Sequence, residues 1–204
     1  MPPTTHSQNP PKQTTSITHA KKATHTFLTT LTHPPSQSSP QSNPLSPLLK
    51  TFTTHPTPLI HEHGHPALAP FLGRDFIGQS GVQEYFTTMG GLLGIRGMKF
   101  EDEGGWVVSF LEDNKNEDGG IRVGVVVRGW ARFFVKGGRR HNGDGDGEGW
   151  DEGFVYRLVV CPEESPEEGD GDGEWKVQEY RVWADTGAAY LALRGELGGL
   201  ERGK

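Results

Sequence analysis

Residues 121–136 read IRVGVVVRGWARFFVK, and residues 149–161 read GWDEGFVYRLVVC. Apolar side chains recur at about every second position of both runs, which is typical of β-strands with one buried face. In the second run this period places five residues on one face: Trp150, Glu152, Phe154, Tyr156 and Leu158. A pocket wall with a single base would have this composition. A face packed against a helix, with Glu152 at its solvated end, is equally consistent with it.

Two further runs of the same kind flank this pair, at residues 98–113 and 174–184. The connections at 116–120, 137–148 and 162–173 each contain Gly with Asp or Asn, the residues that favour hairpin turns. Strands joined in this way form an antiparallel meander. The acidic connections resemble calcium-binding loops only superficially, because they lack the further acids and the flanking helices of an EF-hand.

In the region before these strands, apolar residues recur at helical spacing instead of at every second position. Ser80 and Gln83 form a predicted capping box, and Gly94 and Gly97 are predicted to end the helix. Its apolar stripe consists of Val82, Tyr85, Phe86, Met89 and Leu93.

Weaker patterns predict a helix between Ile17 and Leu31, a short helix at 45–52 and a strand at 57–64. After the last strand, Asp185 is predicted to cap a short helix that ends at Leu193. We therefore predict an α+β domain. A strongly curved antiparallel sheet carries the N-terminal helices on its concave face and leaves an internal pocket beneath them.

Charge is distributed unevenly along the chain. Residues 1–61 contain four lysines and no acid, whereas the remainder holds 26 acids against 16 bases, a charge of −10. A body of that charge is a poor match for phosphates, so we expect no nucleic acid partner. We expect residues 1–14 to be a disordered tail and 15–44 a weak helix with a Pro/Ser/Thr-rich loop. We expect residues 45–197 to form a single domain and residues 198–204 to be a flexible tail.

The single cysteine, Cys161, allows no internal disulfide and favours a reducing compartment. It closes an apolar run, so we interpret it as a small buried residue rather than a nucleophile. No run approaches the roughly 20 apolar residues of a membrane span, and we expect no membrane partner. We predict a soluble, cytoplasmic protein. Import into an organelle is the alternative, because the N-terminus is acid-free and rich in Ser and Thr, although it has no Arg before Arg74.

Two stretches resemble a known superfamily. FLGRDFIG at 71–78, followed by GVQEYF at 81–86, resembles the passage into the third helix of the nuclear transport factor 2-like superfamily. EWKVQEY at 174–180, followed by Trp183-Ala184-Asp185, resembles its closing strand. The resemblance spans residues 45–197. The superfamily includes ketosteroid isomerase and the SnoaL-like polyketide cyclases.

The resemblance implies a cone-shaped fold with a small pocket. Members are isomerases, dehydratases, cyclases or hydrolases, or modules that bind a ligand or dimerise. In the enzymes, the pocket supplies a carboxylate or a His as base, and a Tyr, Asp or Arg as donor to an oxyanion.

HEHGH at residues 61–65 is the most suggestive cluster of candidate catalytic residues. On a strand, His61 and His63 share one face while Glu62 takes the other. Two imidazoles at this spacing could begin a metal site, but the sequence shows no third ligand, so we predict no metal. His63 at the pocket mouth is a candidate general base, and a polar strand end is the alternative. Which of His61, His63 and His65 faces the pocket stays open.

Arg128 lies in the middle of its strand and needs an anionic partner. That partner is either an oxygen of a ligand or the carboxylate of Glu152 or Asp185. Asp185 is itself either a base or only the helix cap. The residues that we expect to bind an apolar or aromatic ligand are Tyr85, Arg128, Trp130, Tyr156, Tyr180 and Trp183, although core packing explains each aromatic equally well.

The resemblance and these candidate residues together imply two alternative functions. The first is a cofactor-free isomerase, dehydratase or cyclase that performs acid–base chemistry on an apolar carbonyl compound. Glu152, His63 or Asp185 would abstract a proton, and a donor (Tyr156, Tyr180 or Arg128) would stabilise the enolate oxygen. The alternative is a non-catalytic module that binds a ligand or forms a homodimer through the sheet. We expect no cofactor in either case.

Overall fold

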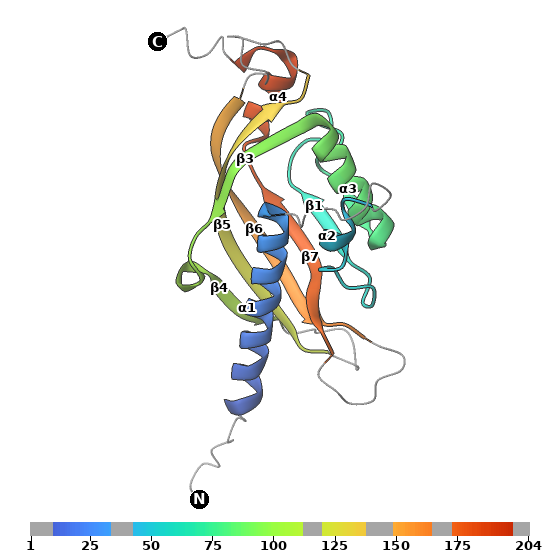
Figure 1. The fold of residues 1–204 in the computed structure, drawn as a ribbon, viewed down its shortest axis with the longest axis vertical. Helices are drawn as coiled ribbons and strands as arrows, with labels where there is room; N and C mark the ends of the chain where they lie inside the picture. Colours follow the sequence, from blue (N-terminus) through green and yellow to red (C-terminus); the bar gives the residue numbers. More distant parts are fainter. Residues whose placement is uncertain (1–9, 34–42, 112–119, 138–148, 165–172, 198–204) are drawn as a thin grey trace, which may run out of the picture.

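The computed structural model describes residues 10–33, 43–111, 120–137, 149–164 and 173–197. Within these residues the strands form one sheet in the order β2-β1-β7-β6-β5-β3, and β4 also pairs with β5 (Figure 1). The strands are β1 (Leu59–Glu62), β2 (Asp75–Ile77), β3 (Leu93–Phe100), β4 (Val107–Leu111), β5 (Arg122–Val135), β6 (Gly149–Pro162) and β7 (Trp175–Trp183). Neighbouring strands are antiparallel, except that β1 runs parallel to β7.

The long strands β5, β6 and β7 form the centre of the sheet, as the period of two predicts. β5 and β6 stay in register from the Val123–Val160 pair to the Phe134–Gly149 pair. Irregularities interrupt the pairing between Arg96 and Lys99 in β3 and next to Val159 in β6. Irregularities of this kind increase the bending and twist of a strand, so the sheet curves around its inner face.

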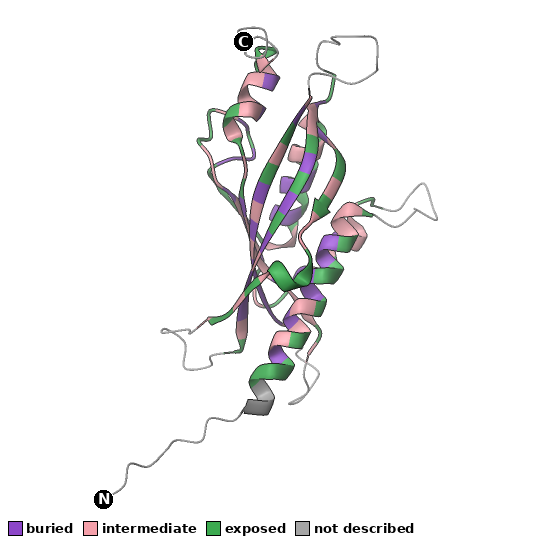
Figure 2. Ribbon diagram, turned by 90° about the vertical axis from the view of Figure 1, so that its left-hand side faces the viewer, coloured by how far each residue is buried: buried purple, intermediate pink, exposed green. Residues whose placement is uncertain are grey.

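Alternation along the strands separates a buried inner face from an exposed outer face (Figure 2). On β5, Val125 and Val127 are fully buried, whereas Arg128 and Trp130 are exposed. The inner face of β6 carries Trp150, Phe154, Tyr156 and Leu158, all buried. The sheet therefore has one apolar, aromatic face and one polar face.

Four helices lie among the described residues: α1 (Pro10–Thr32), α2 (Ser46–Leu49), α3 (Gly78–Leu92) and α4 (Thr186–Arg194). The first of them, α1, crosses the inner face and contacts β5, β6 and β7 (Figure 1). α3 packs on β1 and β2 and buries Val82, Tyr85 and Phe86. The predicted α+β class and the predicted packing of helices on the concave face are therefore confirmed. None of the described helices is both long enough and apolar enough to cross a membrane.

The predicted strand at 98–113 is wrong in its extent. Two strands occupy this region, since β3 begins at Leu93 and ends at Phe100, and a 3-10 turn at Glu103–Gly105 precedes β4. β3 pairs with the second half of β5 and β4 pairs with the first half. The turn therefore lets two short strands share one edge of β5, an arrangement that periodicity along the chain does not specify.

The predicted ends of the third helix are also wrong. α3 begins at Gly78, whose φ of +75° favours glycine, and no side chain caps it, so Ser80 lies inside its first turn. The helix ends at Leu92 and passes directly into β3, which contains Gly94. A Cβ on Gly94 would lie 2.1 Å from the Phe134 ring, so this glycine serves strand packing rather than helix termination. The three-residue strand β2 was not predicted, because only one of its residues is buried.

We expect α1 to be part of the cooperatively folded unit. Phe27 is fully buried, and its ring centroid lies 5.5 Å from Phe52 and 5.2 Å from Tyr180. Phe27→Ala should therefore lower the free energy of unfolding by about 3–4 kcal/mol, the usual cost of an aromatic cavity. Urea unfolding measures this loss. Thr29→Ala, on the exposed side of the same helix, is the control and should change stability by less than about 0.5 kcal/mol. A Phe27→Ala variant as stable as that control would show that α1 is not part of the unit.

Candidate functional site

A buried carboxyl group, Glu62 on β1, lies on the inner face of the sheet. Its residue is 7% exposed, and the Tyr85 hydroxyl donates a hydrogen bond of 2.6 Å to Glu62 Oε2. Burial raises the pKa of Glu62 from 4.5 to about 7, because the ionised form loses its hydration. The Tyr85 hydrogen bond opposes this shift, and the charge of Glu152 adds to it. Glu62 therefore exchanges its proton near neutral pH.

Three tyrosines continue this group of polar side chains inside the cone. Tyr85, Tyr156 and Tyr180 are each at least 95% buried, and the rings of the last two lie 4.9 Å apart. Burial raises the pKa of all three hydroxyls above the usual value. A hydrogen bond between Tyr156 and Tyr180 lowers the pKa of the first and raises that of the second, so Tyr180 is the donor. The three hydroxyls are therefore neutral at physiological pH and can donate hydrogen bonds.

Glu152 lies on the same face, at its solvent-accessible edge. Trp150 Nε1 donates to Glu152 Oε2, and the backbone N–H of Asp185 donates to Oε1 at 3.0 Å. Burial raises the pKa of Glu152, and its hydrogen bonds to Trp150 and Asp185 oppose the shift. Glu152 also lines a hollow of about 730 Å³ together with Trp130 and Arg132. Glu152 is therefore a half-buried carboxylate that shares the face of Tyr156 and also borders a hollow open to solvent.

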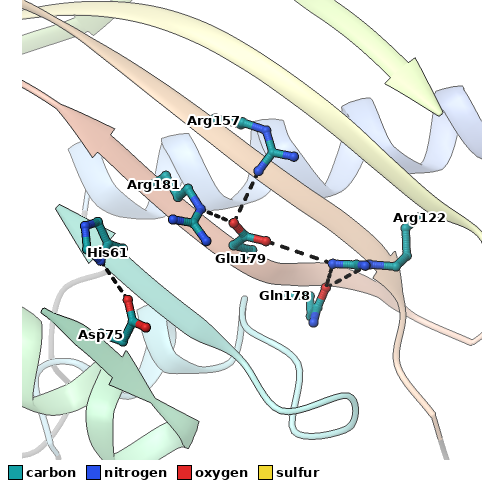
Figure 3. A network of polar contacts seen from close by, with 7 residues as sticks. All are labelled: His61, Asp75, Arg122, Arg157, Gln178, Glu179 and Arg181. Atoms are coloured by element: carbon teal, nitrogen blue, oxygen red, sulfur yellow. Dashed lines mark hydrogen bonds and ion pairs between the residues drawn. The ribbon is translucent and has the colours of Figure 1, made fainter. Parts of the chain in front are cut away.

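The histidines of the HEHGH cluster lie outside this interior. Ile60 and Glu62 point inward, so His61 and His63 point outward. His61 Nδ1 lies 2.7 Å from Asp75 Oδ1 (Figure 3). Of the alternatives that the sequence left open, the outward position of His61 and His63 fits a polar strand end, and Glu62 faces inward instead. His65 is exposed and accepts a hydrogen bond from its own loop.

His63 stacks on Trp183 with a ring-centroid distance of 4.2 Å. Burial lowers the pKa of His63, and the charges of His61 and Arg181 lower it further. It is therefore neutral on the outer face and is not placed to act as a base on a ligand inside the cone. Among the described residues, no group of three or more His, Cys, Asp or Glu could hold a metal ion.

Arg128, Trp130 and Trp183 also lie on the outer face. The Arg128 side chain is 64% exposed and pairs with Glu101 at 2.8 Å, not with Glu152 or Asp185 as the sequence suggested. Trp130 and Trp183 are 43% and 40% exposed. The alternation of the strands places all three opposite to Tyr156 and Tyr180, so the predicted ligand-binding residues fall into two separate groups.

Ion pairs between arginines and a glutamate link the strands on the outer face. Glu179 accepts hydrogen bonds from Arg157, at 3.2 Å, and from Arg181, and Arg122 lies 3.9 Å away (Figure 3). Figure 3 shows these side chains in front of the strands with α1 behind them. One carboxylate between several guanidinium groups relieves the repulsion of the directly opposed Arg157 and Arg181.

Asp185 caps α4. Its Oδ1 accepts hydrogen bonds from the backbone N–H groups of Gly187 and Ala188, at 3.0 and 3.1 Å. The capping role predicted from the sequence is therefore present. Because its N–H also holds Glu152, Asp185 positions the carboxylate at the edge of the interior.

Sequence reasoning missed Glu62 as a site residue. The signal was present, because Glu62 alternates with Ile60 on a strand whose other face carries the histidines. Alternation defines two faces of a strand but does not say which one is buried. The two histidines favoured their own face as the functional one, and that face lies outward. Cys161 is buried and its pKa is raised to about 12 by burial, as expected of a structural thiol.

No protein-family model matches the chain, and no curated protein matches it. Solved structures resemble it at the level of overall shape. A ketosteroid isomerase-like protein from Erwinia carotovora atroseptica is 11% identical, with a TM-score of 0.48 over 83% of this chain and 96% of the other. A Catenulispora acidiphila protein in complex with S-DNPA is 13% identical, with a TM-score of 0.48 over 86% of this chain and 98% of the other.

A third similar structure is ActVI-ORFA from Streptomyces coelicolor. It is 11% identical, with a TM-score of 0.41 over 84% of this chain and 98% of the other. At these scores none of the three assigns a reaction or a ligand to this chain, so the function is inferred from the residues themselves.

The raised pKa of Glu62 predicts a pH-dependent stability. The folded pKa is about 7 against 4.5 for a free carboxyl, so the native state binds more protons than the unfolded state between these values. The wild type should therefore lose stability as pH rises through this window and level off above it. The amide of a Glu62→Gln variant would keep an acceptor for Tyr85 and cannot ionise. Relative to this variant, the wild type should lose about 3 kcal/mol between pH 4.5 and 8.

Urea unfolding at several pH values measures this difference. Glu84→Gln, which changes an exposed carboxylate paired with Arg74, is the matched control. Its difference from the wild type should vary by less than about 0.5 kcal/mol over the same range. A flat difference for Glu62→Gln as well would mean that Glu62 titrates like a surface carboxyl.

Proposed function

We propose that the protein is a cofactor-free acid–base enzyme that acts on an apolar carbonyl compound as an isomerase, dehydratase or cyclase. One observation carries the proposal. Glu62 is a buried carboxyl with a pKa of about 7, hydrogen-bonded to Tyr85 at 2.6 Å. A general base is most effective when its pKa lies near the working pH. Surface carboxylates do not meet this condition, because their pKa is near 4.

The neighbouring groups supply the rest of the chemistry. Glu62 takes a proton from the carbon next to the carbonyl group. The hydroxyl of Tyr156 or Tyr180 donates a hydrogen bond to the enolate oxygen that forms. Return of the proton to another carbon gives an isomer, loss of a β-hydroxyl as water gives an alkene, and attack of the enolate carbon on a second carbonyl closes a ring. Burial keeps the tyrosine protons in place throughout.

The walls of the interior favour an apolar substrate. Phe27, Phe86 and Phe154 surround the tyrosines, with ring centroids 4.7–6.3 Å from Tyr156 or Tyr180. Glu152, at the solvent-accessible edge and electrostatically coupled to Glu62, is proposed to pass protons between Glu62 and solvent. His63 and Asp185 have no role in this proposal, since one lies on the outer face and the other caps α4.

Proton exchange tests the proposal without knowledge of the natural substrate. A panel of apolar enolisable ketones in D₂O is followed by proton NMR for loss of the α-proton signal. The wild type should accelerate exchange of at least one compound, with a rate that rises as pH passes through about 7. Glu62→Gln should lower that rate about 100-fold or more, and Tyr85→Phe should shift the pH dependence.

Glu84→Gln is again the control, because Glu84 precedes Tyr85 on the same helix but is exposed. It should leave the exchange rate unchanged. If no ketone exchanges, or if Glu62→Gln exchanges as fast as the wild type, the enzymatic proposal fails.

The outer face favours a second candidate function, a homodimerisation module that pairs through the sheet. Val107, Trp130 and Trp183 are 64%, 43% and 40% exposed. The pairing of Val107 with Val126 and of Trp183 with Val155 places them on the same face. Large exposed apolar side chains that share one face commonly mark an interaction surface. A second copy of the chain is the partner that we propose.

Sedimentation velocity tests this second candidate. The wild type should be a dimer at micromolar concentration, and the double variant Trp130→Ser, Trp183→Ser should weaken dimerisation about 100-fold. Ile77→Ser, which removes an exposed apolar residue from β2, should have no effect. A wild type that is monomeric throughout contradicts the dimer but leaves the acid–base proposal standing.

A further inference from the structure

A second hollow shares no lining residue with the acid–base site described above. This helix cleft, of about 390 Å³, is bordered by α1, by the residues around α2 and by the start of β7. Figure 1 shows α1 and α2 lying beside β7. The residues that matter here are His19, Lys22, Thr26, Lys50, Trp175 and Lys176. Its volume is that of a small-molecule site.

Positive charge collects in the helix cleft. Lys22, Lys50 and Lys176 line it, against one carboxylate, Glu174. Lys176 Nζ lies 3.3 Å from Glu163 and from Glu174, so its charge is already shared. Lys22 and Lys50 form no ion pair with any residue that the structure describes. Within the described part of the chain, two ammonium groups of the cleft thus have no anionic partner, although the net charge of the whole sequence is −6.

Lys21 and Lys22 are adjacent on α1 but differ in their surroundings. Lys21 does not line the cleft, and it pairs with Glu103 at 3.0 Å. Lys22 belongs to the cleft, as do His19 and Thr26 on the same side of α1. In the acid-free N-terminal part of the chain, Lys21 is therefore paired with a carboxylate of the protein, whereas Lys22 is available to a ligand of the cleft.

An aromatic wall completes the helix cleft. The rings of His19 and Trp175 meet edge to face, with centroids 5.9 Å apart. The indole Nε1–H of Trp175 is buried and has no hydrogen-bond acceptor among the described residues. A buried donor without an acceptor is costly, and a ligand oxygen that reached it after a small side-chain movement would satisfy it.

We propose that the helix cleft binds a small organic anion with a flat apolar part. Lys22 and Lys50 neutralise the anionic group, and Trp175 with His19 contacts the flat part. The lining favours a ligand with both an anionic group and a flat apolar part. An inorganic ion would need no aromatic wall, and a neutral aromatic compound would need no lysines. This site is separate from Glu62 and does not depend on the acid–base chemistry proposed for the interior.

Isothermal titration calorimetry of the full chain with phenyl phosphate tests the proposal. The wild type should bind it saturably, more tightly than it binds inorganic phosphate or phenol, and less tightly as salt is added. Lys22→Gln and Lys50→Gln should each weaken binding about fivefold or more. Lys21→Gln removes the same charge one residue away and should change the affinity by less than about twofold. Circular dichroism establishes that each variant is folded.

Three results would overturn the proposal. One is the absence of saturable binding to the wild type. Another is equal affinity for phenyl phosphate and inorganic phosphate, which would leave the aromatic wall without a role. The third is a Lys21→Gln variant that weakens binding as much as Lys22→Gln, since the effect would then be one of net charge rather than of the helix cleft. Wild-type affinity in both Lys22→Gln and Lys50→Gln would place the ligand elsewhere and equally refute it.

Discussion

The packing of Tyr180 fixes how the helices lie on the sheet. This side chain, on the inner face of β7, has its ring 5.2 Å from Phe27 of α1 and stacks 6.3 Å from Phe86 of α3. Its ring also lies 4.9 Å from Tyr156 of β6. One buried aromatic thus joins both long helices to the centre of the sheet. Because its hydroxyl also belongs to the interior polar group, the packing of the core determines the geometry of the candidate site.

The cost of burying Glu62 is the second constraint. An ionised carboxylate is poorly solvated in this interior, and a single hydrogen bond from Tyr85 offsets only part of that penalty. An apolar side chain at this position would pack without the penalty. A destabilising, ionisable group retained among aromatic rings is more typical of a functional site than of a structural core. On the outer face, by contrast, the charge of Glu179 is stabilised by the arginines that donate hydrogen bonds to it.

Much of the fold could be predicted from the sequence, because β5, β6 and β7 are long and each has one buried face. Their predicted ranges agree with the observed ones to within a residue or two at each end. The division of the next strand into β3 and β4 could not be predicted, since it depends on two strands sharing the edge of β5. Short β2 is likewise defined by its partner β1 rather than by its own pattern.

The site was predictable only in part, for the same physical reason. Alternation correctly grouped Tyr156 with Glu152 and separated them from Arg157. It could not say which face of the four-residue strand β1 is buried, so His63 was preferred to Glu62. Trp130 and Trp183 were assigned to the interior because they are aromatic. The structure exposes both, and Trp130 lies beside Gly153, which has no side chain to cover the indole.

The proposed acid–base chemistry requires that an interior carboxyl of this protein changes its protonation near neutral pH. Carbon-13 NMR of the glutamate side-chain carboxyl carbons, with Glu62 assigned by comparison with Glu62→Gln, measures it most directly. The Glu62 resonance should titrate with a midpoint near pH 7. A midpoint near 4.5, the value of a carboxyl in water, would contradict it.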